Sequence, residues 1–184
     1  MKRMLFIASI ALFFAACNSS ASKTEETAKT ETTAPPAETI DYAYLPANHP
    51  PDNWDRGDQK NIAMVLKSLK AWENGNVEES ASYFADSVEL GFDGFEKKVS
   101  HDTLLAMIKD LRKNISSVSI RMQDYESVIS KDKKEEWVSL WYKEITTDNK
   151  GKTDSVFYMD DLKISNGKIT VLDQKSRRYS TAKK

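Results

Sequence analysis

Cysteine is almost missing from this chain of 184 residues, which contains a single one, Cys17. No disulfide can therefore form within the chain, and no metal site built from several thiolates is available. A folded domain in this chain must be stabilised by its hydrophobic core alone.

Histidine and glycine are also scarce, with two and six residues. His49 lies in a proline-containing segment, so His101 is the only histidine of the region expected to fold. One histidine without clustered carboxylates gives no set of metal ligands. The chain also has no Gly-rich phosphate loop, no nucleophile elbow and no Ser-His-Asp set. We therefore expect neither a metal nor another cofactor.

Long apolar runs are limited to one segment near the start, Met4–Phe14. This run is shorter than the roughly 20 apolar residues that span a bilayer. Lys2 and Arg3 precede it, and two alanines separate it from Cys17. A basic start, a short apolar stretch and small residues at the cut are typical of a secretory signal peptide.

The cysteine directly after the two alanines resembles the lipobox of bacterial lipoproteins, with Phe14 in place of the usual leucine. The resemblance implies a signal peptide over residues 1–16 and acylation of Cys17. It also implies a lipid anchor in the bacterial cell envelope, on the outer membrane or facing the periplasm. The alternative is an ordinary secretory signal with an incidental cysteine, which would leave an unpaired thiol in an exported protein.

Charge of one sign is not in excess, because the chain has 27 basic and 28 acidic residues. Removal of the signal peptide takes away two basic residues and leaves a formal charge near −3. This balance gives no reason to expect a nucleic acid as partner.

Composition divides the mature chain into three parts. Residues 17–53 comprise the acylated cysteine, a Ser/Thr/Ala/Glu/Lys tether without large apolar residues, and a Pro/Tyr-containing arm from Ile40 onward. Such a tether buries too little surface to fold. The arm is expected to lie on its own domain rather than on a partner. Residues 54–179 form the predicted domain, and residues 180–184 a basic tail.

Apolar residues at helical spacing predict three helices. The first starts at an Asp58 cap and ends at Gly75, and a second short one starts at Asn76 and extends to Phe84. Ser100 caps the third helix, whose apolar stripe runs to Ile115.

Alternating apolar residues and turn sequences predict the strands. Asp93-Gly94 and Asn166-Gly167 each join two strands as tight hairpin turns. Four antiparallel strands follow the third helix, and the one over residues 137–146 is apolar on both faces, as a central strand is. Three helices and a meander predict an α+β domain.

This order of elements resembles the nuclear transport factor 2-like superfamily, close to its SnoaL-like bacterial members. The likeness rests on residues 66–86, on the hairpin after Ser87, and on the Asp161–Ile169 ending with its Asn-Gly-Lys-Ile turn. It implies three helices packed on a strongly bent, mostly antiparallel sheet that forms a cone-shaped cavity. It also implies a homodimer formed through the sheet. None of these motifs is catalytic.

His101 and Asp93 are candidates for acid–base chemistry, because enzymes of this superfamily use a residue inside the cone. Histidine is the usual side chain for acid–base chemistry near neutral pH, and His101 stands beside Asp102. It also follows a helix cap, where a surface residue is the simpler interpretation. Asp93 precedes a glycine and is more simply a turn residue.

Asp160 and Asp161 are adjacent, so a strand directs them to opposite faces and one of them can enter the cavity. Asp160 is therefore a further catalytic candidate, although a solvent-facing carboxylate is the default. Four aromatic residues are candidates for the cavity lining, and core packing is the alternative for them. They are Trp137, Trp141, Tyr142 and Tyr158.

Two functions follow from these patterns. The first is a non-catalytic module that binds a small apolar molecule in the cone or a protein on the sheet. The second is a SnoaL-like or isomerase-type enzyme with a cavity carboxylate or His101 as general base. A cavity-facing aspartate with a raised pKa favours the enzyme, and a cone filled by Trp and Tyr favours the binding module.

Overall fold

A computed structural model describes residues 40–178 of the chain. The predicted signal peptide, Cys17, the tether and the basic tail lie outside the described residues. The elements are β1 (Trp54–Arg56), α1 (Gln59–Asn74), α2 (Val77–Ser82), β2 (Phe84–Phe92), β3 (Phe95–Ser100), α3 (His101–Arg112), β4 (Ile115–Ser130), β5 (Glu136–Asp148), β6 (Thr153–Ser165) and β7 (Lys168–Arg178).

Local signals set both ends of α1 and the start of α3 as predicted. The Asp58 side chain accepts a hydrogen bond from the backbone N–H of Lys60, and Gly75 ends α1 in the left-handed conformation. Ser100 accepts from the N–H of Thr103 at the start of α3. Both helices therefore begin at residues that their own sequences specify, and α1 also ends at one.

Two helix boundaries differ from the prediction. α2 ends at Ser82 rather than Phe84, because Phe84 pairs with Ile169 of β7 and starts β2. Asn76 makes no side-chain bond to the backbone of α2; its amide instead donates to the carboxylate of Glu79. α3 ends at Arg112, and Ile115 starts β4. Tertiary strand pairing decided these boundaries.

The seven strands form one sheet in the order β1-β4-β5-β6-β7-β2-β3. β2 and β7 pair in parallel, and every other neighbouring pair is antiparallel. β5 lies between two long strands, as its two apolar faces predicted. β1 was not predicted, because three residues are too short for a periodic signal.

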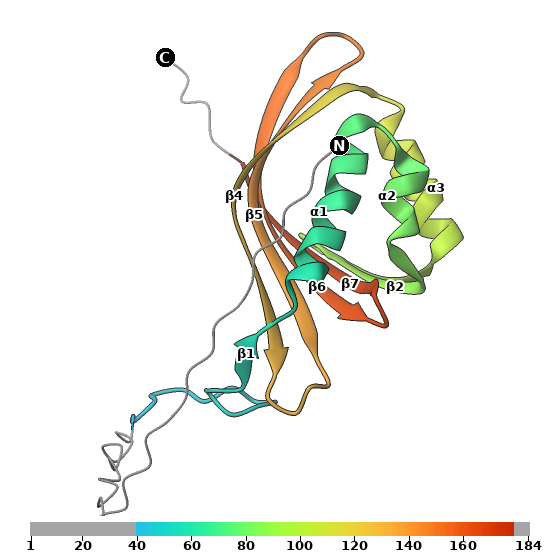
Figure 1. Cartoon of the computed structure of the whole chain (residues 1–184). Helices are drawn as coiled ribbons and strands as arrows, with labels where there is room; N and C mark the ends of the chain where they lie inside the picture. The colour runs from blue at the N-terminus through green and yellow to red at the C-terminus, as the bar shows by residue number, and fades with distance from the viewer. Residues whose placement is uncertain (1–39, 179–184) are drawn as a thin grey trace, which may run out of the picture. The chain divides into compact units, whose positions relative to one another are not determined.

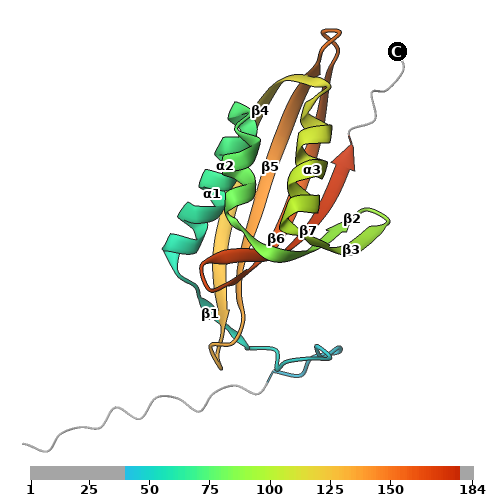
Figure 2. The ribbon, with the colours of Figure 1, turned by 90° about the vertical axis from the view of Figure 1, so that its right-hand side faces the viewer.

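All three helices lie on one side of the sheet, which curves around them (Figures 1 and 2). The core between the helices and this concave face includes Val65 of α1, Leu104 of α3 and Leu140 of β5. The opposite, outer face of the sheet carries no helix. This α+β arrangement confirms the predicted fold class.

The arm before β1 only partly contacts its domain. The ring of His49 meets that of Trp54 edge-on at 5.5 Å, and the N–H of Lys131 donates to the carbonyl of Asn53. Tyr44 and Leu45, in contrast, are 91% and 69% exposed. The prediction that the arm packs on the domain is therefore wrong for these two residues.

None of the helices within residues 40–178 has the length and apolar character needed to cross a membrane.

Candidate ligand cavity

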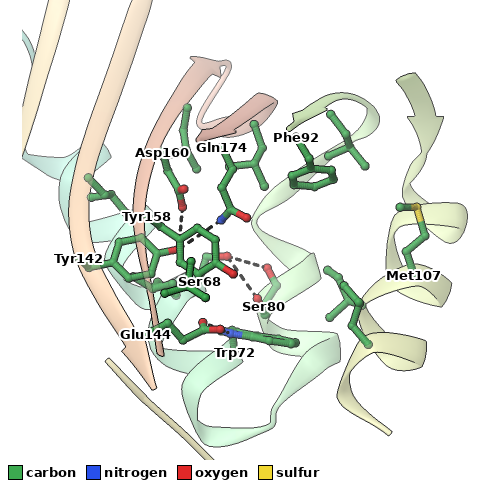
Figure 3. Close-up of a pocket in the computed structure, with 18 of the residues that line it drawn as sticks. Ser68, Trp72, Ser80, Phe92, Met107, Tyr142, Glu144, Tyr158, Asp160 and Gln174 are labelled. Atoms are coloured by element: carbon green, nitrogen blue, oxygen red, sulfur yellow. Dashed lines mark hydrogen bonds between the residues drawn. The ribbon is translucent and has the colours of Figure 1, made fainter. Parts of the chain in front are cut away.

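A cavity of about 360 Å³ lies between the helices and the concave face of the sheet. Leucine, valine, isoleucine and aromatic side chains make up most of its wall. Most of the polar groups lie on β5, β6 and β7, and Ser68 and Ser80 add hydroxyls from α1 and α2 (Figure 3). The volume falls in the range of small-molecule sites, roughly 300–1,000 Å³. The concave sheet and the helices therefore leave room for a ligand rather than closing on a filled core.

Strand alternation decides which side chains reach this cavity. Tyr142 pairs with Tyr158 across β5 and β6, and Leu140 pairs with Asp160. These residues all line the cavity, whereas the residues between them, such as Trp141 and Met159, face the other way. The pairing register of β5 with β6 therefore brings these polar side chains together in one wall of the cavity.

Asp160 is the most perturbed group in this wall. It is 5% exposed, and its Oδ2 accepts a hydrogen bond of 2.8 Å from the hydroxyl of Tyr142. Its Oδ1 is buried without a hydrogen-bond partner among residues 40–178. Burial raises the pKa of Asp160 to about 7, against the opposing effect of the hydrogen bond from Tyr142. The carboxyl group can therefore gain or lose a proton near neutral pH.

The two tyrosines beside Asp160 remain protonated. Their rings lie 5.6 Å apart and tilted by 41°. Burial raises the pKa of Tyr158 to about 12. Burial, together with the charge of Asp160, raises the pKa of Tyr142 well above its ordinary value. Both hydroxyls are therefore donors at neutral pH, and the amide of Gln174 also approaches the Tyr142 oxygen at 3.4 Å.

Glu144 is a second buried carboxyl of the cavity, two residues beyond Tyr142 on β5. One of its oxygens accepts a hydrogen bond of 2.8 Å from the indole N–H of Trp72 on α1. Burial raises the pKa of Glu144, and the nearby Arg112 opposes this shift. The Arg112 guanidinium lies over the Trp72 ring, 5.4 Å from its centroid. It is hydrogen-bonded to the carbonyls of Ile115 and Glu73 rather than to Glu144.

Exposed residues mark the mouth of the cavity. Asp154 and Arg178, near the ends of β6 and β7, line it and form an ion pair of 2.9 Å. Leu111 of α3 also lines it and is 63% exposed. The predicted buried stripe of α3 is therefore wrong at Leu111, because this side chain borders an opening rather than a packed core.

The structure separates the aromatic candidates into two groups. Tyr142 and Tyr158 line the cavity, as predicted. Trp137 and Trp141 are absent from its wall and lie on the outer face, where the Lys163 ammonium stands 5.5 Å from the Trp137 ring centroid. Their assignment to the cavity is wrong, because the helices cover the other face of β5.

The catalytic candidates divide in the same way. Asp160 lines the cavity, and Asp161 faces outward, as adjacent residues of a strand must. His101 is outside the cavity wall, and its Nε2 lies 3.1 Å from the carbonyl of Ala81. Asp93 occupies the β2–β3 turn and accepts a hydrogen bond from Ser176. His101 and Asp93 therefore have local structural contacts, and Asp160 alone reaches the cavity.

Sequence reasoning missed several polar residues of the cavity wall, among them Trp72, Glu144 and Gln174. Glu144 had a signal, because it shares a strand face with Tyr142. Trp72 falls on the apolar face of α1 at helical spacing, which gives no sign of the hydrogen bond from its indole to Glu144. Gln174 had no signal, since its position depends on the pairing of β6 with β7.

Among residues 40–178, no three His, Cys, Asp or Glu side chains converge as they do around a metal ion.

Known proteins resemble this chain in fold but not in sequence. Neither a model of a known protein family nor a curated protein matches it. Among solved structures, AusH from Aspergillus nidulans is 17% identical, with a TM-score of 0.54 over 67% of this chain and 87% of that one. An epoxide hydrolase of LEH-like type from M. tuberculosis is 11% identical, with a TM-score of 0.53 over 64% and 83%.

A third structure, an NTF2-like protein of unknown function from Burkholderia pseudomallei, is 15% identical. Its TM-score is 0.52 over 66% of this chain and 92% of that one. Likenesses at this level of identity show the fold alone. The described part of the chain therefore has the nuclear transport factor 2-like fold that its element order resembled.

Proposed function

We propose that this domain binds a small, largely apolar molecule inside the cone, with a polar group of that molecule against Asp160. The observation that supports this proposal is the buried Asp160 carboxyl, whose Oδ1 lacks a partner in the wall of an otherwise apolar cavity. A buried polar atom without a partner is costly, and a ligand that supplies a hydrogen bond removes that cost. Displacement of water from the apolar wall adds to the affinity.

The proposed location of this binding is the bacterial envelope. The apolar start of the chain, its two alanines and Cys17 support a lipid anchor at that cysteine. The segment between Cys17 and β1 then tethers the cone to the membrane surface. A homodimer through the outer face of the sheet belongs to the same proposal, since this face carries half-buried Trp137 and Trp141 without a covering helix.

Native mass spectrometry of the full chain tests the binding. The mass under native conditions is compared with the mass under denaturing conditions, because a lipid on Cys17 survives both whereas a bound ligand is lost in the second. We expect a discrete additional mass under native conditions. The same spectra report whether the chain is a monomer or a dimer.

A matched pair of variants shows whether the additional mass occupies the cone. Met107→Trp enlarges a side chain of the cavity wall, and Met159→Trp enlarges one on the outer face. We expect the first to lower the bound fraction at least tenfold and the second to leave it unchanged. A ligand retained equally by both variants contradicts binding in the cone.

The second candidate function is acid–base catalysis of the SnoaL or isomerase kind, and the pKa of Asp160 near 7 favours it. A general base works best when its pKa lies near the working pH. In this function Asp160 is the general base, a role for which the sequence offered either a cavity carboxylate or His101. The Tyr142 hydroxyl donates a hydrogen bond to the Asp160 carboxylate. Deuterium uptake at carbon in the retained molecule, in deuterated water, tests this function. Uptake that persists in Asp160→Asn contradicts it.

A further inference from the structure

Resting on the binding function proposed above, we infer that the molecule bound in the cone is an organic amine, with a cationic amino group on an apolar body. The ammonium group lies against the carboxyl of Asp160, in the same wall that carries Glu144 beyond the Tyr142–Tyr158 pair. The apolar body occupies the space toward the helices.

The charges of the cavity wall carry this inference. The wall includes three carboxyl groups, on Glu144, Asp154 and Asp160, but one cationic side chain, Arg178. Arg178 is already paired with Asp154 at the mouth. Within residues 40–178, no ion pair to Glu144 or Asp160 is formed. The inner part of the cavity wall therefore has two carboxyls and no cation paired with them, although Arg112 outside this wall acts on Glu144 and opposes the rise of its pKa.

The burial of these two carboxyls makes the absence of a cation costly. An ionised carboxylate in an apolar site needs a paired charge, or it takes up a proton instead. Burial raises the pKa of both groups, and the charge of Glu144 raises the pKa of Asp160 further. An ammonium group against Asp160 supplies a positive charge together with up to three N–H donors, one of which satisfies Asp160 Oδ1. The same charge acts on Glu144 from farther along the wall.

The aromatic residues of the wall suit the same ligand. A cation within about 6 Å of an aromatic face is attracted by the ring, most strongly when it is removed from water. The aromatic side chains lining the cavity are Trp72, Phe84, Phe92, Tyr142 and Tyr158. They also offer apolar area to the body of the amine.

Other ligand classes fit the wall less well. A carboxylate or phosphate places its negative charge in a wall with two buried carboxyls, and this like-charge repulsion is unfavourable. A neutral alcohol or ketone satisfies Asp160 Oδ1 or the Tyr158 hydroxyl but leaves the two carboxyls without a cation. This set of side chains therefore favours an amine over an anion or a neutral alcohol.

Three probes with one skeleton test the inference on the full chain in detergent micelles: adamantylmethylamine, adamantylmethanol and adamantanecarboxylate. Calorimetric titration at pH 8 gives the dissociation constant of each. We expect the amine to bind at least tenfold tighter than the alcohol, and the carboxylate to bind more weakly than both.

Variants assign the selectivity to the two carboxyls. Asp160→Asn is expected to weaken the amine at least tenfold and the alcohol no more than twofold. Glu144→Gln removes the other carboxylate charge, and it is also expected to weaken binding of the amine more than binding of the alcohol. Asp161→Asn is the matched control, because this neighbouring carboxylate faces outward, and it is expected to change neither affinity.

The outcomes separate this inference from the function on which it rests. An alcohol that binds as tightly as the amine overturns the amine assignment and leaves binding in the cone intact. If Asp160→Asn and Glu144→Gln weaken binding of the amine and of the alcohol equally, the amine assignment is wrong as well. If none of the three probes binds, the proposed binding function itself is wrong, and the inference with it.

Discussion

Asp160 and Asp161 are neighbours in sequence, yet the two faces of the sheet give them opposite surroundings. On the outer face, Asp161 accepts a hydrogen bond of 2.6 Å from Ser139 and forms an ion pair of 2.8 Å with Lys175. On the inner face, Asp160 is hydrogen-bonded to Tyr142 and has one oxygen without a partner. The fold thus satisfies one aspartate, and it leaves the other with an oxygen that has no partner among residues 40–178.

The same contrast extends along both faces. On the outer face, Lys175 also pairs with Asp173, and Lys163 pairs with Glu135. On the inner face, Glu144 accepts from an indole rather than from a cation. The sheet therefore separates a surface with balanced charges from a cavity with unbalanced ones. Three variant pairs sharpen this comparison.

The largest expected difference concerns packing. Leu140→Ala removes a side chain that is 1% exposed between the sheet and the helices. Loss of such a buried leucine costs about 2–5 kcal/mol of the free energy of unfolding. Met159→Ala, on the outer face where the residue is 38% exposed, should cost less than about 1 kcal/mol. Urea denaturation measures both. Equal losses from the two variants contradict a core confined to the inner face.

The next difference concerns the two aspartates and pH. The pKa of Asp160 is about 7 in the folded chain and about 3.9 in an unfolded one. Between these values the folded state holds a proton that the unfolded state has lost, so stability falls as the pH rises from 4 to 7. Asp160→Asn removes this loss and should raise the free energy of unfolding at pH 8 by up to about 4 kcal/mol.

Unfolding curves measured between pH 4 and pH 8 check this expectation. The slope of stability against pH should flatten in Asp160→Asn, with a smaller slope left by Glu144, whose pKa is also raised. Asp161→Asn, which breaks an outer ion pair, should change stability by about 1 kcal/mol or less at every pH. A variant Asp160→Asn with the original slope contradicts a raised pKa at this residue.

The smallest difference concerns the two tyrosines. Tyr142→Phe removes the donor to Asp160 and should cost about 1–3 kcal/mol. Because this hydrogen bond favours the ionised carboxylate, its loss should raise the pKa of Asp160 further. Carbon NMR of the aspartate carboxyls follows that pKa directly. Tyr158→Phe is the control, since no hydrogen bond joins Tyr158 to Asp160, and a larger shift from it than from Tyr142→Phe contradicts this pairing.

Local chemistry made several elements predictable. Asp58 and Ser100 cap helices through bonds to residues two and three positions away. Asn166 and Gly167 both take positive φ, as a two-residue hairpin requires. The opposite directions of Asp160 and Asp161 likewise followed from alternation within one strand. These features depend on a few consecutive residues, which the sequence displays directly.

The misplaced tryptophans show where that reasoning ends. β5 is apolar on both faces, so its sequence indicates two sets of side chains but not which set the helices cover. Trp137 and Trp141 are cavity candidates as aromatic residues, but Val138 and Leu140 of the other set are the buried ones. Glu144 was missed for the same reason, because its role depends on which face is inside.

The sequence by itself determined the caps, the turns, the alternation along each strand and the resemblance to a conical α+β fold. Tertiary structure alone decided that Asp160, Glu144 and Tyr142 share one enclosed space, and it alone shifted their pKa values. The physical reason is range. Caps and turns act over a few residues, whereas burial of a carboxyl depends on strands and helices that are distant in the chain and meet only when it folds.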